Sequence, residues 1–154
     1  MPATDGNTGT EVKETMSLLK IHLILVCIWL GLVLVETVIE FAGPHSNENL
    51  QRVARYHSLV DGLFELPIVL AVLGTGVTLA WRIWPLENLM LVKVTAGLIA
   101  IAANLYCATL VFVRRWSVSN EQTLARLSWH VRFTWIAVPF GLCALWIGLR
   151  RSMG

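Results

Sequence analysis

Residues 17–41 read SLLKIHLILVCIWLGLVLVETVIEF, and this stretch decides the fold class of the chain. Apolar residues dominate it over about 20 positions, the length that a helix needs to cross a hydrocarbon core of about 30 Å. The stretch before it, residues 1–16, is polar and has neither the basic start nor the small-residue cleavage site of a signal peptide. We therefore expect a permanent membrane helix at 17–41, preceded by a polar N-terminal tail.

Three more apolar runs follow and predict helices at about 50–81, 88–115 and 121–150. Of the 154 residues, 56% are hydrophobic and only 14% are charged, so a soluble domain of this size cannot bury the apolar surface. The sequence predicts an all-α, integral membrane four-helix bundle spanning 17–151, with up-down-up-down helices and both termini on the same side. We expect the protein in a bacterial inner (plasma) membrane. Its expected partner is the lipid bilayer, and we expect no binding to nucleic acid.

Three features bear on how these helices pack. Pro67 lies inside the second run and predicts a kink, because proline removes one backbone hydrogen bond. The third run is rich in Gly and Ala, which suits close packing within the chain, in a homo-oligomer or against a partner in a membrane complex. Cys27, Cys107 and Cys143 lie in separate apolar runs without a CxxC pair, so we expect free, apolar thiols.

The apolar runs also carry polar side chains at helical spacing. In the first run, His22, Trp29 and Glu36 recur every seven residues, and Glu40 follows Glu36 by one turn. A charged side chain at a membrane helix centre costs about 2.5–3.5 kcal/mol on insertion scales, so such residues indicate a site inside the bundle.

The second and fourth runs repeat this pattern. His57, Asp61 and Glu65 are spaced by four, and Glu65 is expected about 12 Å deeper than His57 from the helical rise of 1.5 Å per residue. In the fourth run, His130 follows Arg126 by four. Because consecutive helices alternate in direction, these groups are expected near the membrane face where the first and third helices end.

This convergence predicts a metal site, because carboxylates and imidazoles are ligands for iron, manganese and zinc, and imidazoles are also ligands for copper. The candidate ligands are Glu36, Glu40, His57, Asp61, Glu65 and His130. The Glu-x-x-His motif of di-iron bundles is absent, so we predict no di-iron centre. Alternative interpretations are ion pairs with arginines (Arg55, Arg126 or Arg132) and proton or ion passage.

Haem b is a second cofactor that these histidines can bind. His57 and His130 meet the requirement for two ligands at similar depth, and His22 is a single candidate ligand at the other face. Lys93 lies just inside the third helix, where it either extends its ammonium group to the headgroups or binds a carboxylate of a substrate or of haem. Asn104 is eleven residues further on and shares its face.

The chain resembles, at a distance, the four-helix membrane proteins related to the haem-binding bacterial protoporphyrinogen oxidases and the copper-resistance D-type proteins. The resemblance rests on Leu19-Lys20-Ile21-His22 with Trp29-Leu30-Gly31, Pro67 with Gly74, and Leu91-Val92-Lys93 with Leu105-Tyr106-Cys107. It implies a haem or metal ligand at His22 and a functional lysine at Lys93. Asn104 stands where the oxidase pattern has a histidine.

Together these features predict a metal- or haem-binding membrane protein with a redox role, acting on a lipid-soluble substrate such as a quinone or porphyrin. A protoporphyrinogen oxidase-like enzyme is one alternative. A non-enzymatic copper- or proton-handling protein, or an accessory subunit, is another.

Overall fold

The computed structural model describes residues 5–42, 47–116, 127, 129–131, 135 and 137–153. Of these, 5–8, 39–40, 42, 47–51, 53–54 and 151–153 are described as backbone only. Over this described part the chain is helical apart from the connection at 83–87, in agreement with the predicted all-α class.

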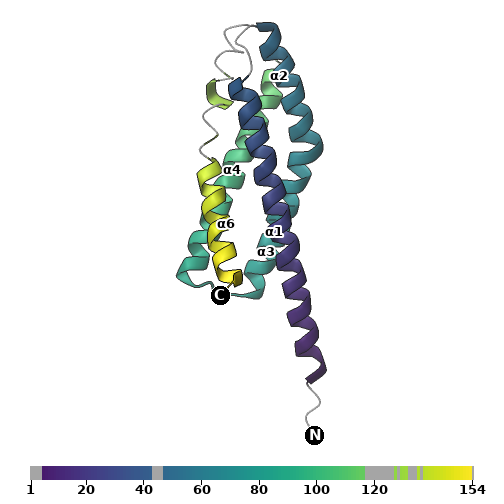
Figure 1. Ribbon diagram of the computed structural model, residues 1–154, viewed down its shortest axis with the longest axis vertical. Helices are drawn as coiled ribbons and strands as arrows, with labels where there is room; N and C mark the ends of the chain where they lie inside the picture. Colours follow the sequence, from purple (N-terminus) through teal and green to yellow (C-terminus); the bar gives the residue numbers. More distant parts are fainter. Residues whose placement is uncertain are drawn as a thin grey trace.

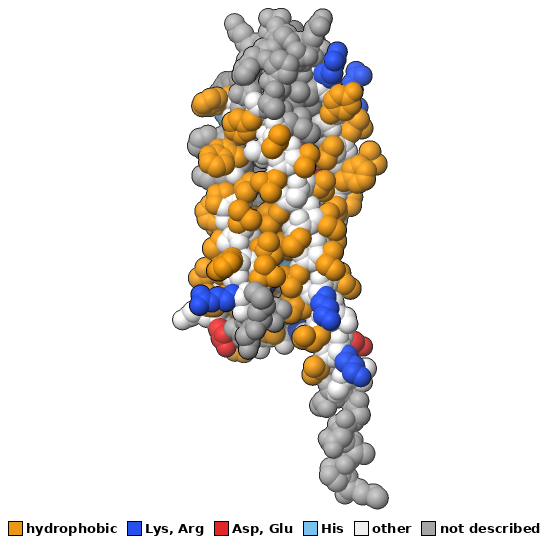
Figure 2. Space-filling model, viewed as in Figure 1, with side chains coloured by type: hydrophobic (Ala, Val, Ile, Leu, Met, Phe, Trp, Pro, Cys, Tyr) orange, Lys and Arg blue, Asp and Glu red, His pale blue; other side chains and the backbone are white. Residues whose placement is uncertain are grey.

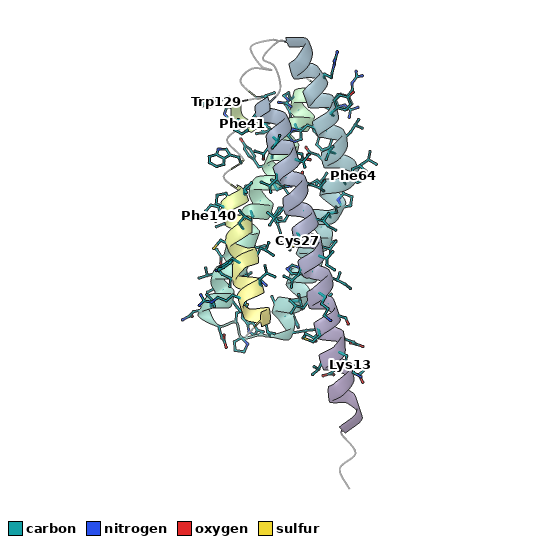
Figure 3. The ribbon with its side chains drawn as sticks, in the orientation of Figure 1. Lys13, Cys27, Phe41, Phe64, Trp129 and Phe140 are labelled. Atoms are coloured by element: carbon teal, nitrogen blue, oxygen red, sulfur yellow. The ribbon has the colours of Figure 1, made fainter. Side chains whose placement is uncertain are left out.

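Helix α1 spans Asp5–Ala42 and, with 38 residues, is about 57 Å long. It begins at Asp5 rather than at residue 17, so most of the predicted tail is helical. The first turns extend past the end of the bundle, where Lys13 lies (Figures 1 and 3). The Arg82 guanidinium donates to Thr15 Oγ1 at 2.8 Å, which holds this polar part of α1 against the end of α3. Apolar length predicts only the part of a helix that meets lipid, and α1 continues beyond it.

The second predicted helix consists of three segments in one continuous rod. Helix α2 spans Asn47–Val60, a π-helical turn η1 spans Asp61–Glu65, and α3 spans Leu66–Arg82. The sequence predicts a kink at Pro67, and a π-helical turn lies just before it, in which the Leu66 N–H donates to the Asp61 carbonyl. Proline has no N–H and its ring crowds the carbonyl four residues earlier, so a wider turn just before it relieves both problems.

Helix α4 spans Asn88–Trp116 and α6 spans Ala137–Met153. In Figure 1, α1 and α4 run in one direction and the α2–α3 rod and α6 run back, so both ends of the chain lie at the same end of the bundle. Helix α1 packs on α3 and α6, and α4 packs on α6 and α2. The predicted helix at 121–150 is helical at 129–131 and from 137 onward, and most of 117–136 lies outside the described residues.

A small apolar core holds the helices together. Its buried members are Val26, Trp29, Leu30, Val69, Val72, Ala100 and Ile101, from α1, α3 and α4. Gly141 brings α6 close to α1, since a Cβ at this position would lie 2.7 Å from Leu30 Cδ2. Small residues therefore set the helix spacing here, as is usual in membrane bundles.

The outer surface is apolar, as expected of a protein in lipid. On the face in Figure 2, hydrophobic side chains cover the middle of the bundle, and Lys and Arg side chains lie only toward its two ends. Leu63 and Phe64 are 64% and 58% exposed, while the neighbouring Glu65 is 3% exposed. Gly9–Val38, Arg55–Arg82 and Asn88–Trp116 are long and apolar enough to cross a membrane, and Ala137–Arg150 is a shorter apolar helix. The chain is therefore a helical membrane bundle with polar groups inside it.

Candidate functional site

Three of the predicted metal ligands meet inside the bundle. The His57 imidazole Nε2 lies 3.5 Å from Glu36 Oε2 and 3.6 Å from Asp61 Oδ1. One ligand atom from each of the three side chains lies within 4.8 Å of the other two. Glu36, His57 and Asp61 are all buried, at 6%, 4% and 1% exposure. We call this group the carboxylate–histidine triad.

The carboxylates of the triad are short of hydrogen-bond partners. Glu36 Oε1 and both oxygens of Asp61 accept no hydrogen bond, and neither does the buried Glu65 Oε1 nearby. Among the described residues, no Lys or Arg forms an ion pair with these three acids. A charged buried carboxylate without a partner is unfavourable by several kcal/mol, so these acids favour either protonation or a bound cation.

The helix geometry explains how the triad is assembled. Glu36 lies near the end of α1, and His57 and Asp61 lie one turn apart on the antiparallel α2–η1 segment, as their i, i+4 spacing predicts. Asp61 and Glu65 are the first and last residues of the π-helical turn, and both are buried. A π-helical turn in a helix is often found at functional sites, and here it turns two acids toward the interior.

The two distances from His57 in the triad match the spacing of ligands around a single metal ion. Nitrogen and oxygen ligands at about 2.0–2.2 Å from a tetrahedral ion lie about 3.3–3.6 Å from one another. The two distances from His57 Nε2, 3.5 and 3.6 Å, fall in this range. They are also long for hydrogen bonds, so the imidazole does not satisfy the carboxylates by itself.

Two of the other predicted ligands, Glu65 and His130, are not members of the triad. Glu65 is buried but does not belong to the group of mutually close ligand atoms. His130 is exposed and is likewise not part of that group. Glu40 is in α1, but its side chain lies outside the described residues. The metal roles of Glu40, Glu65 and His130 therefore remain predictions.

The alternative that arginines pair with the buried acids can be checked for one of the three arginines. Arg55 is exposed and makes no ion pair with Glu36 or Asp61. Arg126 and Arg132 lie outside the described residues.

A small cavity of about 30 Å³ lies beside the triad. Glu36, His57, Glu65 and Asn104 contribute polar groups to its wall. Asn104, predicted on the haem side, thus lies at the carboxylate side of the bundle. Its Oδ1 accepts a hydrogen bond of 3.3 Å from the Trp29 indole, and its Nδ2 has no partner.

A second, much larger cavity of about 550 Å³ occupies the opposite half of the bundle. Its wall is almost entirely apolar and includes Trp29, with His22 and Lys93 as its ionisable residues. This volume falls in the range of about 300–1,000 Å³ that small-molecule and cofactor sites have. Trp29 borders this cavity while its partner Asn104 borders the small one, so their hydrogen bond lies in the partition between the two.

His22 is hydrogen-bonded to a residue that the sequence did not single out. His22 Nδ1 lies 2.8 Å from Thr75 Oγ1, and the Ala71 and Val72 carbonyls are acceptors within reach of the Thr75 hydroxyl, at 2.7 and 3.1 Å. When Thr75 donates to one of these carbonyls, its oxygen accepts from Nδ1–H, and His22 keeps its lone pair on Nε2. Depth in the membrane could have identified Thr75. Glu36 and Asp61 lie at similar depth on antiparallel helices, His22 precedes Glu36 by fourteen residues, and Thr75 follows Asp61 by fourteen, so His22 and Thr75 also lie at similar depth.

Glycines make room for both ionisable residues of the large cavity. A Cβ at Gly76 would lie 3.2 Å from His22 Cε1, and one at Gly148 would lie 3.2 Å from Lys93 Nζ. Lys93 is half-buried and has neither a hydrogen bond nor an ion pair within the described part of the chain. The large cavity thus combines an apolar wall, one imidazole acceptor and one cation.

Compared with protein-family models, with curated proteins and with solved structures, the chain gives no match in any of the three.

Proposed function

We propose that this protein crosses a bacterial inner membrane four times and binds one divalent transition-metal ion at the carboxylate–histidine triad, where the ion has a redox role. The observation that carries the proposal is the approach of Glu36, His57 and Asp61 with three carboxylate oxygens left without hydrogen bonds. Two carboxylates and one neutral imidazole balance the charge of a divalent ion and suit iron or manganese, with copper as a further candidate. Zinc fits the ligand types but has no redox chemistry, so zinc in the site would contradict the redox role.

Metal analysis of the purified protein tests this proposal. We expect about one metal ion per chain in the wild type, and less than a tenth of that in His57→Ala, because loss of one of three ligands leaves the site incomplete. His130→Ala is the comparison variant, since it removes an exposed imidazole outside the triad that the sequence also predicted as a ligand. Full metal content in that variant would assign the histidine ligand to His57 alone. Full metal content in a folded His57→Ala protein would refute the proposed site.

A second candidate function follows from the large cavity. Its volume, the Nε2 lone pair of His22 and the cation of Lys93 are compatible with haem b bound through His22, or with a lipid-soluble quinone or porphyrin substrate. A histidine that ligates a metal usually donates its other N–H to a fixed acceptor, and Thr75 supplies one here. An oxidase-like activity on a porphyrin belongs to this candidate.

Absorption spectroscopy separates the two candidates. Haem at His22 predicts a Soret band that is lost in His22→Ala and shifted in Thr75→Val, with the metal content of the triad unchanged. A protein with triad-bound metal and no Soret band would exclude the haem form of this candidate. A protein with neither cofactor that copurifies with a membrane partner would instead support an accessory subunit.

A further inference from the structure

We propose that the small cavity beside the triad holds an exchangeable small ligand of the metal ion: either a water molecule, which Asn104 and Glu65 both hold in place, or a small anion, which Asn104 holds against repulsion by Glu65. This inference rests on the proposed metal site and assigns to it an open coordination position. Metal sites that carry out reactions keep such a position, whereas purely structural sites are closed by protein ligands.

The size and place of the cavity support this assignment. With about 30 Å³, the cavity has room for one or two molecules the size of water, and its wall includes both Glu36 and His57. An ion held by the triad therefore borders this space. Within the described residues the triad supplies three ligands, so a tetrahedral ion there leaves a fourth position to a molecule from the cavity.

Two polar atoms without partners also border this space. Asn104 Nδ2 is a buried donor and Glu65 Oε1 a buried acceptor, and neither forms a hydrogen bond. Both side chains line the cavity and are more than nine-tenths buried. Because a buried water typically makes two to four hydrogen bonds to otherwise unsatisfied groups, one molecule in the cavity can satisfy both atoms.

Trp29 determines which end of the Asn104 amide serves the cavity. An indole N–H can only donate, so the Asn104 atom 3.3 Å from Trp29 Nε1 must be the carbonyl oxygen. The amide NH₂ then remains for the cavity ligand. Trp29 is accordingly a positioning residue, and it also closes the small cavity off from the large one.

The two residues are expected to have opposite effects on an anion. The Asn104 NH₂ donates to a metal-bound anion and stabilises it, whereas the Glu65 carboxylate repels it. Thr37 also lines the cavity, but its hydroxyl already donates to the Val33 carbonyl at 2.7 Å. Thr37→Val is therefore the matched control, with little expected effect.

The experiment is an azide titration of the purified protein loaded with Co²⁺, followed by the visible absorption of the ion, with the bound Co²⁺ measured by elemental analysis. We expect azide to change the wild-type spectrum, Asn104→Leu to weaken azide binding about tenfold and Glu65→Gln to strengthen it, all at unchanged Co²⁺ content. Trp29→Phe keeps the aromatic ring, frees the amide and should weaken azide binding severalfold. Thr37→Val should stay within about twofold of the wild type.

The outcomes distinguish the two proposals. A wild type that binds no Co²⁺ would refute the triad site, and this inference with it. A wild type that binds Co²⁺ but shows no spectral response to azide would refute the open position alone. Azide affinities within about twofold of the wild type in both Trp29→Phe and Glu65→Gln would refute the roles assigned to Asn104 and Glu65.

Discussion

Replacing Asp61 by Asn should change the stability of this protein in opposite directions without and with metal. The Asp61 side chain is 1% exposed, and neither of its oxygens accepts a hydrogen bond. An unsatisfied buried polar group costs about 1–3 kcal/mol, and a charged one costs more. An amide at this position carries no charge and can donate to a neighbouring carboxylate. Metal-free Asp61→Asn should therefore be more stable than the metal-free wild type by about 1–3 kcal/mol.

Metal reverses this order. A ligand present at a thousand times its dissociation constant stabilises the folded state by about 4.1 kcal/mol, provided that it binds only that state. The wild type should gain this amount, whereas Asp61→Asn, with a weaker ligand in place of a carboxylate, should gain less than about 0.5 kcal/mol. The variant is thus the more stable protein after chelation and the less stable one, or at best an equal one, in saturating metal.

The assay is denaturant unfolding in detergent micelles, with the free energy of unfolding measured after chelation and again at increasing metal concentration. Glu14→Gln is the control, because Glu14 is an exposed carboxylate that only approaches Arg82 at 3.9 Å. It should change stability by less than about 0.5 kcal/mol under both conditions. If metal-free Asp61→Asn is less stable than the wild type and keeps the full metal-dependent gain, the account of the triad as an uncompensated cation site is wrong.

Two further predictions concern packing and lipid exposure. Gly141→Leu should destabilise the bundle by about 1–3 kcal/mol, because a Cβ there already meets Leu30 at 2.7 Å, whereas Gly74→Ala should have little effect because no atom lies within 4 Å. Thermal unfolding of both variants in detergent measures this, and equal losses would contradict it. Phe64→Asp should reduce membrane insertion by about 2.5–3.5 kcal/mol, since its exposed side chain faces lipid in mid-helix. Val12→Asp, at the protruding end of α1, should insert almost normally in the same glycosylation-based insertion assay.

Much of the fold follows from sequence, because lipid imposes a simple length rule on helices. That rule predicted ends within a few residues of those seen for the α2–α3 rod and α4, but it placed the start of α1 at residue 17 instead of Asp5. The predicted start of the fourth helix at 121 lies outside the described residues. The polar residues before 17 form helix because helical propensity and the contact with Arg82 act outside the membrane, where apolarity carries no information.

The candidate site was predictable in part for a similar reason. Spacing and depth brought together Glu36, His57 and Asp61, since antiparallel helices with known ends leave little freedom in depth. Spacing and depth do not determine how each helix is rotated about its own axis. Eleven-residue spacing placed Asn104 on the same face as Lys93, but only packing could show that its amide pairs with Trp29 and borders the carboxylate side.

The π-helical turn at Asp61–Glu65 has a consequence for how this protein can change over evolutionary time. Such a turn contains one residue more than the α-helical path needs, so α2 and α3 are out of phase by about 100° relative to one uninterrupted helix. Deleting one residue there would restore a regular helix and rotate every side chain on one side of it. A single codon deletion within the turn would therefore rotate Glu65 and α3 by about 100° relative to Asp61 and α2, and would separate the two acids.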